Sequence, residues 1–482
     1  MVIIMKLYNL INGVAKTELP DMEITCLTSD SRTEMKSGGM FVCIKGATFD
    51  GHSAAAEMLE RGAAVVVTER DLGLDRQIIV EDTRAAYPIL CSAWFGHPER
   101  KLKLVGVTGT NGKTTITTVM KKILSALGCK TGLIGTCQNE IGDEVYPTSR
   151  TTPEPYDLFE LFDKMADKGC EYVIMEASSQ GLEQKRLGPC RFAAGVFTNL
   201  TQDHLDVHGT MENYYQAKKI LFDISEKAII NIDDDYGKRY AKEITCPYKT
   251  FSAVSKADFY AEDILLSASG VKYVFCDGKT KHNVDFKMPG LFNVSNSLAV
   301  IACCETLGFD TEKVIKALNK MQGVRGRAEV VPTGRDFTVI CDYAHTPDAL
   351  ANVLSAIRQS ADGKVKCLFG CGGNRDATKR PLMAAAAADN ADFLIVTSDN
   401  PRNEDPEEII KDVLKGLEGK STPYIKICDR REAIYWAVRN AEKDDIIVLA
   451  GKGHEDYQIL AGGVKIHFDE REVVAEALAQ SD

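Results

Sequence analysis

The sequence has no apolar run of the length that a membrane span requires, which is about 18 residues or more. Even the apolar stretch 382–396 is interrupted by Asp389, Asn390 and Asp392. The start of the chain also differs from a secretory signal, because Lys6 interrupts its short apolar run and no small-residue cleavage site follows. We therefore expect a cytoplasmic protein without a membrane span.

The sequence also has fewer basic than acidic residues. The 58 Lys and Arg residues are outnumbered by 69 Asp and Glu residues, which gives a net charge of −11 at pH 7. An acidic protein repels polyphosphate backbones, so the composition argues against nucleic acid as a partner. The 15 cysteines show no paired CxxC spacing, and this pattern favours buried thiols over a metal site.

A glycine-rich segment, Gly109-Thr110-Asn111-Gly112-Lys113-Thr114-Thr115, follows an apolar run at 103–107 and precedes a helical stretch. Such a turn between strand and helix surrounds phosphate oxygens with backbone N–H groups, while its lysine reaches the β- and γ-phosphates and the following hydroxyl can bind Mg²⁺. The common spacing has glycine at the position of Val107. We expect an ATP or GTP site. Phosphate binding alone does not separate an ATPase, a switch protein and a synthetase.

The length of 482 residues exceeds what one hydrophobic core usually organises. Apolar runs alternate with helical stretches, and the alternation restarts after Arg327. We therefore predict an α/β fold in three domains. These are a small N-terminal α/β domain at 1–99, a central P-loop domain with a mostly parallel sheet and helices at 100–330, and a C-terminal Rossmann-like domain at 331–482.

The phosphate loop resembles that of the Mur ligases, a family that also includes folylpolyglutamate synthetases. The likeness covers essentially the whole chain. Further matching segments, in the family's order, are 175–179, 199–206, 214–218, 293–296, 326–327, 342–348, 370–380, 399–402 and 451–455. Such ligases are understood to phosphorylate a carboxylate with ATP and to let an amine displace the phosphate. The last three segments are most similar to enzymes that add the third residue of the wall peptide.

The resemblance implies an ATP site and a Mg²⁺ site. The implied catalytic residues are Lys113, Glu176, His204 and Lys218. The implied metal ligands serve two Mg²⁺ ions. Thr114 binds the first, Glu176 and His204 hold the second, and Lys218, as a carbamate formed with CO₂, is a further ligand. The implied ATP-binding residues are Gly109, Thr110, Asn111, Gly112, Lys113, Thr114, Thr115, Asn293, Asn296, Arg327 and Asp342. Taken without the family, Glu176 is typical of a surface carboxylate at a strand end, and Lys218 beside Lys219 is typical of a solvated helix face.

The resemblance also implies the acceptor, UDP-N-acetylmuramoyl-L-alanyl-D-glutamate, and assigns 1–99 to its UDP part. The implied acceptor-binding residues are Ser31, Thr151, Thr152, Ser178, Gln184 and Arg186. Gln180 departs from the family, where many relatives have His. We expect the enzyme to be a monomer that acts in peptidoglycan synthesis.

The added amino acid is inferred from Arg402. A guanidinium can pair with both oxygens of a carboxylate, which suits the distal carboxylate of meso-diaminopimelate and would repel the lone distal ammonium of L-lysine. The family likewise associates this arginine with diaminopimelate. The implied amino-acid-binding residues are Arg375, Asp399, Asn400, Pro401, Arg402, Gly451 and Glu455.

Four alternatives stay open at this point. The same ligase could use L-lysine, or a sibling ligase could add a dipeptide or a different wall residue. A folylpolyglutamate-type ligase could share the phosphate loop and use a folate acceptor. A nucleotide-dependent switch would account for the phosphate loop but not for the acceptor and amino-acid segments.

Overall fold

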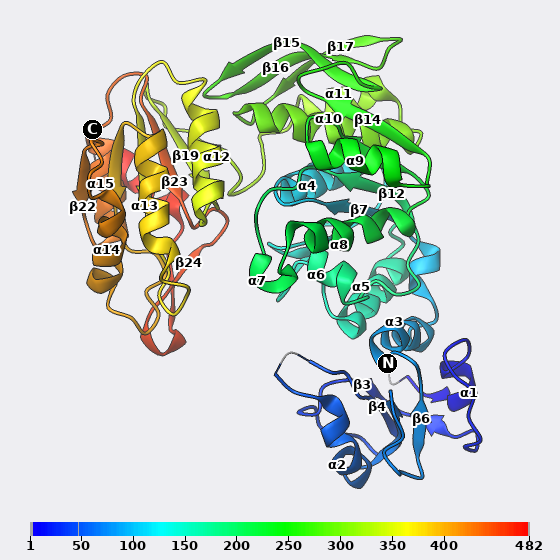
Figure 1. Ribbon diagram of the computed structural model, residues 1–482. Coiled ribbons are helices and arrows are strands. Elements are labelled where there is room, and N and C mark those ends of the chain that lie inside the picture. The colour runs from blue at the N-terminus through cyan, green and yellow to red at the C-terminus, as the bar shows by residue number, and fades with distance from the viewer. Residues whose placement is uncertain (1–2, 47, 481–482) are drawn as a thin grey trace. The chain divides into compact units, whose positions relative to one another are not determined.

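The computed structural model describes residues 3–46 and 48–480 (Figure 1). The chain divides into two compact units, Met1–Thr250 with Ala302–Phe309 and Phe251–Ile301 with Asp310–Asp482. Strands and helices alternate through both units, which confirms the predicted α/β class. The domain boundaries at 99/100 and 330/331 stay predictions.

A small parallel sheet opens the first unit, and Figure 1 draws it in blue. Its strand order is β3-β4-β5-β6, and every neighbouring pair is parallel. The helix that follows it is capped by Asp82, whose carboxylate accepts a hydrogen bond from Ala85 N. The elements are β1 Met5–Lys6, α1 Leu7–Leu10, β2 Glu23–Ile24, β3 Leu27–Thr28, β4 Gly39–Val42, α2 Ala55–Glu60, β5 Ala63–Thr68, β6 Gln77–Ile79 and α3 Thr83–Trp94.

The larger sheet of the first unit carries the phosphate loop. Its order is β10-β9-β8-β11-β7-β12-β13, and it is parallel from β8 to β13 with an antiparallel hairpin at the β10 edge. The carboxyl ends of β11, β7 and β12 therefore lie side by side, where α/β proteins bind ligands. The elements are β7 Lys103–Thr108, α4 Lys113–Ala126, β8 Thr131–Ile134, β9 Asn139–Ile141, β10 Glu144–Tyr146, α5 Pro155–Asp167, β11 Tyr172–Glu176, α6 Ser179–Glu183, β12 Phe192–Phe197, α7 Leu205–His208, α8 Met211–Asp223, β13 Ala228–Asn231, α9 Asp235–Glu243 and β14 Tyr248–Ser252.

An antiparallel meander begins the second unit. β15 Phe259–Ser267 pairs with β16 Gly270–Cys276, which pairs with β17 Lys281–Phe286. Two helices follow, α10 Leu291–Thr306 and α11 Thr311–Leu318. The sequence analysis did not identify these three strands.

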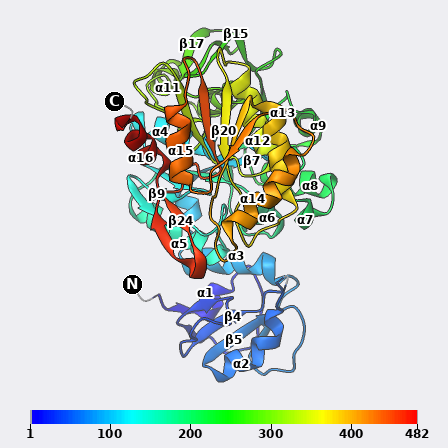
Figure 2. The same cartoon turned by 90° about the vertical axis from the view of Figure 1, so that its left-hand side faces the viewer.

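The second unit also contains a sheet of order β18-β19-β23-β20-β21-β22, parallel except for β18. Helices α12 to α14 pack on one face and α15 and α16 on the other, so each face has its own apolar cluster (Figure 2). This is the predicted Rossmann-like arrangement. The elements are β18 Glu329–Val331, β19 Thr338–Asp342, α12 Pro347–Arg358, β20 Val365–Phe369, α13 Lys379–Asn390, β21 Phe393–Val396, α14 Pro406–Leu414, β22 Tyr424–Lys426, α15 Arg430–Arg439, β23 Ile446–Ala450, β24 Tyr457–Ile459, β25 Lys465–His467 and α16 Glu470–Ala479.

Within residues 3–46 and 48–480, no helix is both long enough and apolar enough to cross a membrane.

Candidate active site

The phosphate loop starts later than the common spacing suggests. Strand β7 continues through Thr108, so Val107 is a fully buried core residue and the first loop glycine is Gly109. Gly109 has φ +148°, and a Cβ there would lie 1.8 Å from Thr198 Oγ1. Only glycine fits such a close approach of two segments. The loop therefore keeps its glycine where the backbone needs it, and the missing glycine at Val107 is explained by the longer strand.

Lys113 begins α4 directly after this loop. Gly112 caps the helix in the left-handed region, with φ +88°. The Lys113 ammonium donates hydrogen bonds to the carbonyls of Gly109 and Thr110, each at 2.7 Å. A cation and a helix N-terminus thus share one loop, which is the arrangement that binds phosphate.

Glu176 is buried, with 1% of its surface exposed, so the interpretation as a surface carboxylate was wrong. It ends β11 beside the phosphate loop. Its Oε1 accepts hydrogen bonds from Thr114 Oγ1 at 3.0 Å and from Thr136 N at 2.9 Å. Its Oε2 accepts from Thr136 Oγ1 at 2.9 Å. The carboxylate and the Thr114 hydroxyl are hard oxygen donors of the kind that Mg²⁺ prefers, so these two residues fit the implied metal.

Lys218 is also buried, with 1% exposure, and the solvated-face interpretation was wrong for it as well. Its Nζ donates to the Gly109 carbonyl at 2.9 Å and lies 4.4 Å from the centre of the Tyr214 ring. Burial lowers the pKa of Lys218 well below its usual value, and the charge of Lys113 lowers it further. The neighbouring Lys219 is the lysine that faces outward, 3.2 Å from a glutamate of α9.

A lowered pKa and a nearby cation both fit the implied carbamate. The uncharged amine is the form that attacks CO₂, and the anionic product would be stabilised by the ammonium of Lys113. Whether Lys218 carries the group stays a prediction.

His204 lies at the start of α7 with a left-handed backbone, φ +52°. Its Nε2 lies 3.5 Å from Asp203 Oδ2, its side chain is 52% exposed, and its ring meets Tyr214 edge-on at 6.2 Å. These contacts do not join it to Glu176, so its metal role stays a prediction. Across residues 3–46 and 48–480, no group of three or more His, Cys, Asp or Glu side chains could hold a metal ion.

Several predicted acceptor residues form one hydrogen-bonded cluster at the end of β11. Thr152 Oγ1 donates to the Glu176 carbonyl at 2.8 Å and accepts from Ser178 N at 3.0 Å. Thr151 Oγ1 lies 3.0 Å from Thr136 Oγ1, which connects the cluster to the Glu176 carboxylate. The acceptor cluster and the metal-ligand pair are therefore contiguous.

Arg186 extends this cluster. Its Nη1 donates to the Thr152 carbonyl and its Nη2 to Gln184 Oε1, both at 2.7 Å. Among the described residues its buried Nε has no hydrogen-bond acceptor, which leaves one donor for an anionic substrate. Ser31 lies elsewhere, in a turn of the N-terminal sheet, where its carbonyl accepts from Arg61 at 2.7 Å.

Two of the predicted ATP-binding residues lie on α10 in the second unit. Asn293 Nδ2 donates to the Pro289 carbonyl at 2.8 Å, and Asn296 Nδ2 donates to Asn293 Oδ1 at 3.0 Å. Both side chains are buried. The pair therefore forms one connected amide group.

Arg327 and Asp342 come together at the carboxyl end of β19. Asp342 accepts hydrogen bonds from Ala328 N at 2.7 Å and Ala344 N at 2.8 Å. Burial raises the pKa of Asp342, and the charge of Arg327 opposes that rise. The Arg327 guanidinium lies 5.0 Å from the Tyr343 ring centre. A cation that can bind phosphate and a carboxylate that can bind ribose hydroxyls thus lie next to an aromatic ring.

Arg375 and Arg402 both lie close to Gly372. A Cβ on this glycine would lie 2.9 Å from Arg402 Nη1 and 3.8 Å from Arg375 Cγ. Arg402 has φ +51°, and its Nη1 donates to the Gly373 carbonyl at 2.9 Å and the Asn400 carbonyl at 3.5 Å. The two arginines predicted to bind carboxylates are therefore neighbours.

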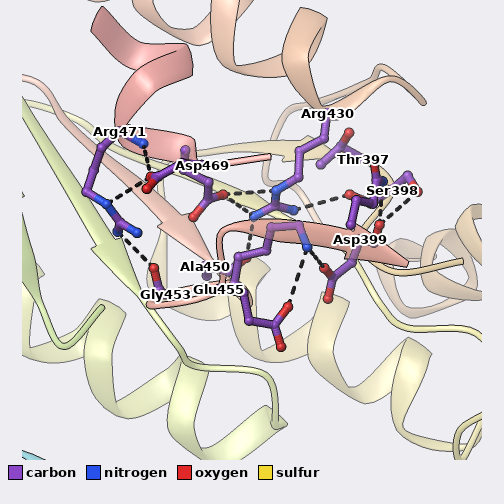
Figure 3. Close-up of polar contacts among 12 residues, drawn as sticks. Thr397, Ser398, Asp399, Arg430, Ala450, Gly453, Glu455, Asp469 and Arg471 are labelled. Atoms are coloured by element: carbon purple, nitrogen blue, oxygen red, sulfur yellow. Dashed lines mark hydrogen bonds and ion pairs between the residues drawn. The ribbon is translucent and has the colours of Figure 1, made fainter. Parts of the chain in front are cut away.

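The other predicted amino-acid residues follow the carboxyl ends of β21 and β23. Figure 3 labels two of them, Asp399 and Glu455. Asn400 Nδ2 donates to Glu455 Oε2 at 3.0 Å. A Cβ on Gly451 would lie 3.6 Å from Asp399 Oδ2. Pro401, between Asn400 and Arg402 in the sequence, is buried. The seven predicted residues thus lie in three loops, which follow β20, β21 and β23.

Models of three protein-family domains match the chain. They are the Mur ligase family catalytic domain at residues 23–91, the Mur ligase middle domain at 107–304 and the Mur ligase glutamate ligase domain at 326–453. The chain belongs to the Mur ligase family. The resemblance inferred from its motifs is therefore confirmed.

Individual relatives are similar over nearly their whole length. The UDP-N-acetylmuramoyl-L-alanyl-D-glutamate--2,6-diaminopimelate ligase of Caldanaerobacter subterraneus subsp. tengcongensis is 46% identical, over 99% of this chain and 100% of its own. The enzyme of that name numbered 1 from Clostridium acetobutylicum is also 46% identical, over 95% and 96%. A solved structure of a ligase with this name has a TM-score of 0.75 and 32% identity and covers 100% of both chains.

Sequence reasoning missed two residues of this Mur ligase that support the site. Thr136, which gives Glu176 two hydrogen bonds, lies outside every motif, so no local signal was available. His208 is fully buried, with Nε2 2.9 Å from Ser179 Oγ and Nδ1 3.2 Å from Glu183 Oε2. It lies just after the segment 199–206 that resembles the family, and this closeness was the available signal.

Proposed function

We propose that this chain is an ATP-dependent ligase that joins meso-2,6-diaminopimelate to the D-glutamate of UDP-N-acetylmuramoyl-L-alanyl-D-glutamate. The products are ADP, phosphate and the UDP-linked tripeptide, a precursor of peptidoglycan. The observation that carries the proposal is the near-full-length similarity to ligases whose names state this acceptor and this amino acid. A ligase that consumes ATP and a UDP-linked precursor is expected to work in the cytoplasm, as a monomer.

The proposed reaction has two steps. The acceptor carboxylate first takes the γ-phosphoryl group of ATP, which gives ADP and an acyl phosphate. The amine of diaminopimelate then attacks the acyl carbon, loses a proton and displaces phosphate. Lys113 supports the first step because its ammonium lies in the phosphate loop and can balance charge on the phosphates.

Thr114 and Glu176 would hold Mg²⁺, which when bound neutralises phosphate charge and lets the acceptor carboxylate approach. His204 and a carbamate on Lys218 complete the proposed ligand set. The buried amine of Lys218 supports this part, because an unpaired ammonium there is disfavoured and an anion beside Lys113 is not.

The acceptor is proposed to bind at Thr151, Thr152, Ser178, Gln184 and Arg186, with Ser31 at its UDP part. The buried, unsatisfied Nε of Arg186 supports this assignment, since a carboxylate of the dipeptide would provide its missing acceptor. The same cluster adjoins Glu176, so a carboxylate held there would lie close to the proposed metal ligands.

Arg402 is proposed to select diaminopimelate over L-lysine by pairing with the distal carboxylate. Arg402 and Arg375 both lie close to Gly372, and this supports the choice, because a substrate with two carboxylates suits a site with two arginines. L-lysine is the second candidate, and it would leave the Arg402 guanidinium without its partner.

The test measures phosphate release with ATP, Mg²⁺ and UDP-N-acetylmuramoyl-L-alanyl-D-glutamate, with meso-diaminopimelate or L-lysine as the amine. Mass spectrometry then identifies the product. A product that forms only with diaminopimelate supports the reaction and the specificity together. A lysine product would overturn the role of Arg402, and no product with either would overturn the proposed function.

A further inference from the structure

Lys452 lies in the loop after β23, between two residues predicted to bind the amino acid, and its side chain is completely buried. Its ammonium donates hydrogen bonds to Asn400 Oδ1 at 3.1 Å and to the Tyr457 carbonyl at 2.8 Å. It also lies 3.2 Å from Asp399 Oδ1 and 3.5 Å from Glu455 Oε2. One buried cation therefore contacts three of the predicted amino-acid-binding side chains.

The charges of this cluster do not cancel. One ammonium faces the carboxylates of Asp399 and Glu455, which Figure 3 shows near each other, so the cluster carries a net negative charge. The side chains of Asp399 and Glu455 are 12% and 15% exposed, whereas that of Lys452 is 0% exposed. The accessible side chains of the cluster are thus the two carboxylates, and the ammonium of Lys452 is buried beneath them.

Asp399 depends on this cation in particular. In the part of the chain that the structure describes, its buried Oδ1 accepts no hydrogen bond, and the Lys452 ammonium at 3.2 Å is its ion-pair partner. A buried carboxylate oxygen without a donor is unfavourable unless a cation is close.

We infer that Lys452 is a positioning residue of the amino-acid site, which holds Asp399, Asn400 and Glu455 in one arrangement that receives a cationic amine. The inference rests on the proposed function. Asn400 connects the cluster to Arg402, whose Nη1 contacts the Asn400 carbonyl. Lys452 thereby sets the spacing between the groups for an amine and the guanidinium for a carboxylate. That spacing discriminates diaminopimelate from amino acids with an amine alone.

The test replaces Lys452 by methionine, which keeps the length of the side chain and removes its charge. The matched control is Lys366→Met. Lys366 is equally a buried lysine of this unit, with its Nζ 2.6 Å from Asp445 Oδ2 and a side chain 8% exposed. Lys366 lies near the start of β20, and Asp445 directly precedes β23. The pair therefore lies at the amino ends of these strands, whereas the amino-acid residues follow the carboxyl ends.

We expect Lys452→Met to raise the KM for diaminopimelate by about tenfold or more, because a buried charge partner of the binding groups is lost. The KM values for ATP and for the UDP-linked acceptor should stay as in the wild type. The ratio of kcat/KM for diaminopimelate to kcat/KM for L-lysine should fall. Lys366→Met should lower thermal stability and leave all three KM values unchanged. Equal KM values in the two variants would overturn the inference.

A second comparison covers the case in which Lys452→Met does not fold. Asp399→Asn removes one opposing charge, so Lys452→Met in that background leaves one carboxylate, that of Glu455, without its cation. The double variant should still show a higher KM for diaminopimelate than Asp399→Asn alone, and equal values would overturn the inference. Failure of the proposed function would appear in the wild type as no diaminopimelate product, whereas failure of this inference would appear with an active wild type.

Discussion

Replacement of Arg430 by methionine is expected to destabilise the second unit strongly. Arg430 begins α15, and its side chain is completely buried, as is that of Glu470. Its Nε and Nη2 donate to Glu470 Oε1 at 2.9 and 2.6 Å. Its Nη1 and Nη2 also donate to the carbonyls of Ser398 at 3.3 Å and Ala450 at 2.8 Å (Figure 3). One guanidinium thus joins two helix starts and two strand ends.

The magnitude follows from what the substitution leaves behind. Glu470 would stay buried without a cation, and the two carbonyls would lose a charged donor. Removal of one partner of a buried ion pair costs about 3–5 kcal/mol. For a unit of roughly 200 residues, each kcal/mol lowers Tm by about 2–4 °C, so the expected fall is roughly 6–20 °C.

Calorimetry of the wild type and of Arg430→Met measures this fall, with Arg431→Met as the control. Arg431 is the next residue of α15 and pairs with Glu476, but these side chains are 39% and 46% exposed. An exposed pair contributes about 1 kcal/mol or less. Combined Arg430→Met and Glu470→Leu should recover much of the loss, because two well-packed apolar side chains can replace a buried pair. A Tm for Arg430→Met equal to that of Arg431→Met would refute the reasoning.

Four further predictions concern the site. Lys218→Ala should lose most ligase activity while the chain stays folded, and full activity would contradict the carbamate. Burial lowers the pKa of Lys218 in the folded chain below its pKa in the unfolded chain. Between these two pKa values the folded chain binds fewer protons, so the free energy of unfolding rises with pH. Lys218→Met should flatten that rise, which urea titrations at several pH values measure. Arg402→Ala should raise the KM for diaminopimelate roughly tenfold to a hundredfold, and an unchanged value would remove its proposed role. Thr136→Val, which removes a hydrogen bond to Glu176, should raise the Mg²⁺ concentration for half-maximal activity about tenfold, whereas an unaltered Mg²⁺ curve would separate Thr136 from the metal site.

The parallel sheets were predictable because their strands are buried on both faces. Such strands form continuous apolar runs, as in β7 and β23, and helices with clear start signals separate them. The meander β15–β17 was missed for the opposite reason. β15 has one buried residue, Phe259, followed by half-buried and exposed residues, and a register shift between Glu262 and Leu265 interrupts its pairing with β16. A strand with this pattern gives a weak local signal.

The residues of the predicted amino-acid site could be found in the sequence because each of them follows a strand of one parallel sheet. Asp399 comes shortly after β21 and Gly451 directly after β23, so their loops must meet at the carboxyl edge. The contacts inside that edge were not predictable. Asn400 and Lys452 are far apart in the sequence, and only the packing of both loops against β24 brings the ammonium to Asn400 Oδ1.

The two buried lysines show where sequence reasoning could have gone further and where it could not. Lys218 lies four residues after Tyr214 and three before Leu221, so helical periodicity already places it in the apolar stripe of α8. Burial in that stripe disfavours the charged form of a lysine, and a neutral amine suits a modified residue beside a phosphate loop. Lys452 lies in a loop, where no periodicity exists, and its burial follows from long-range contacts with Asn400 and Tyr457. A charge hidden in a helix can therefore be inferred from spacing, whereas a charge hidden in a loop requires the fold.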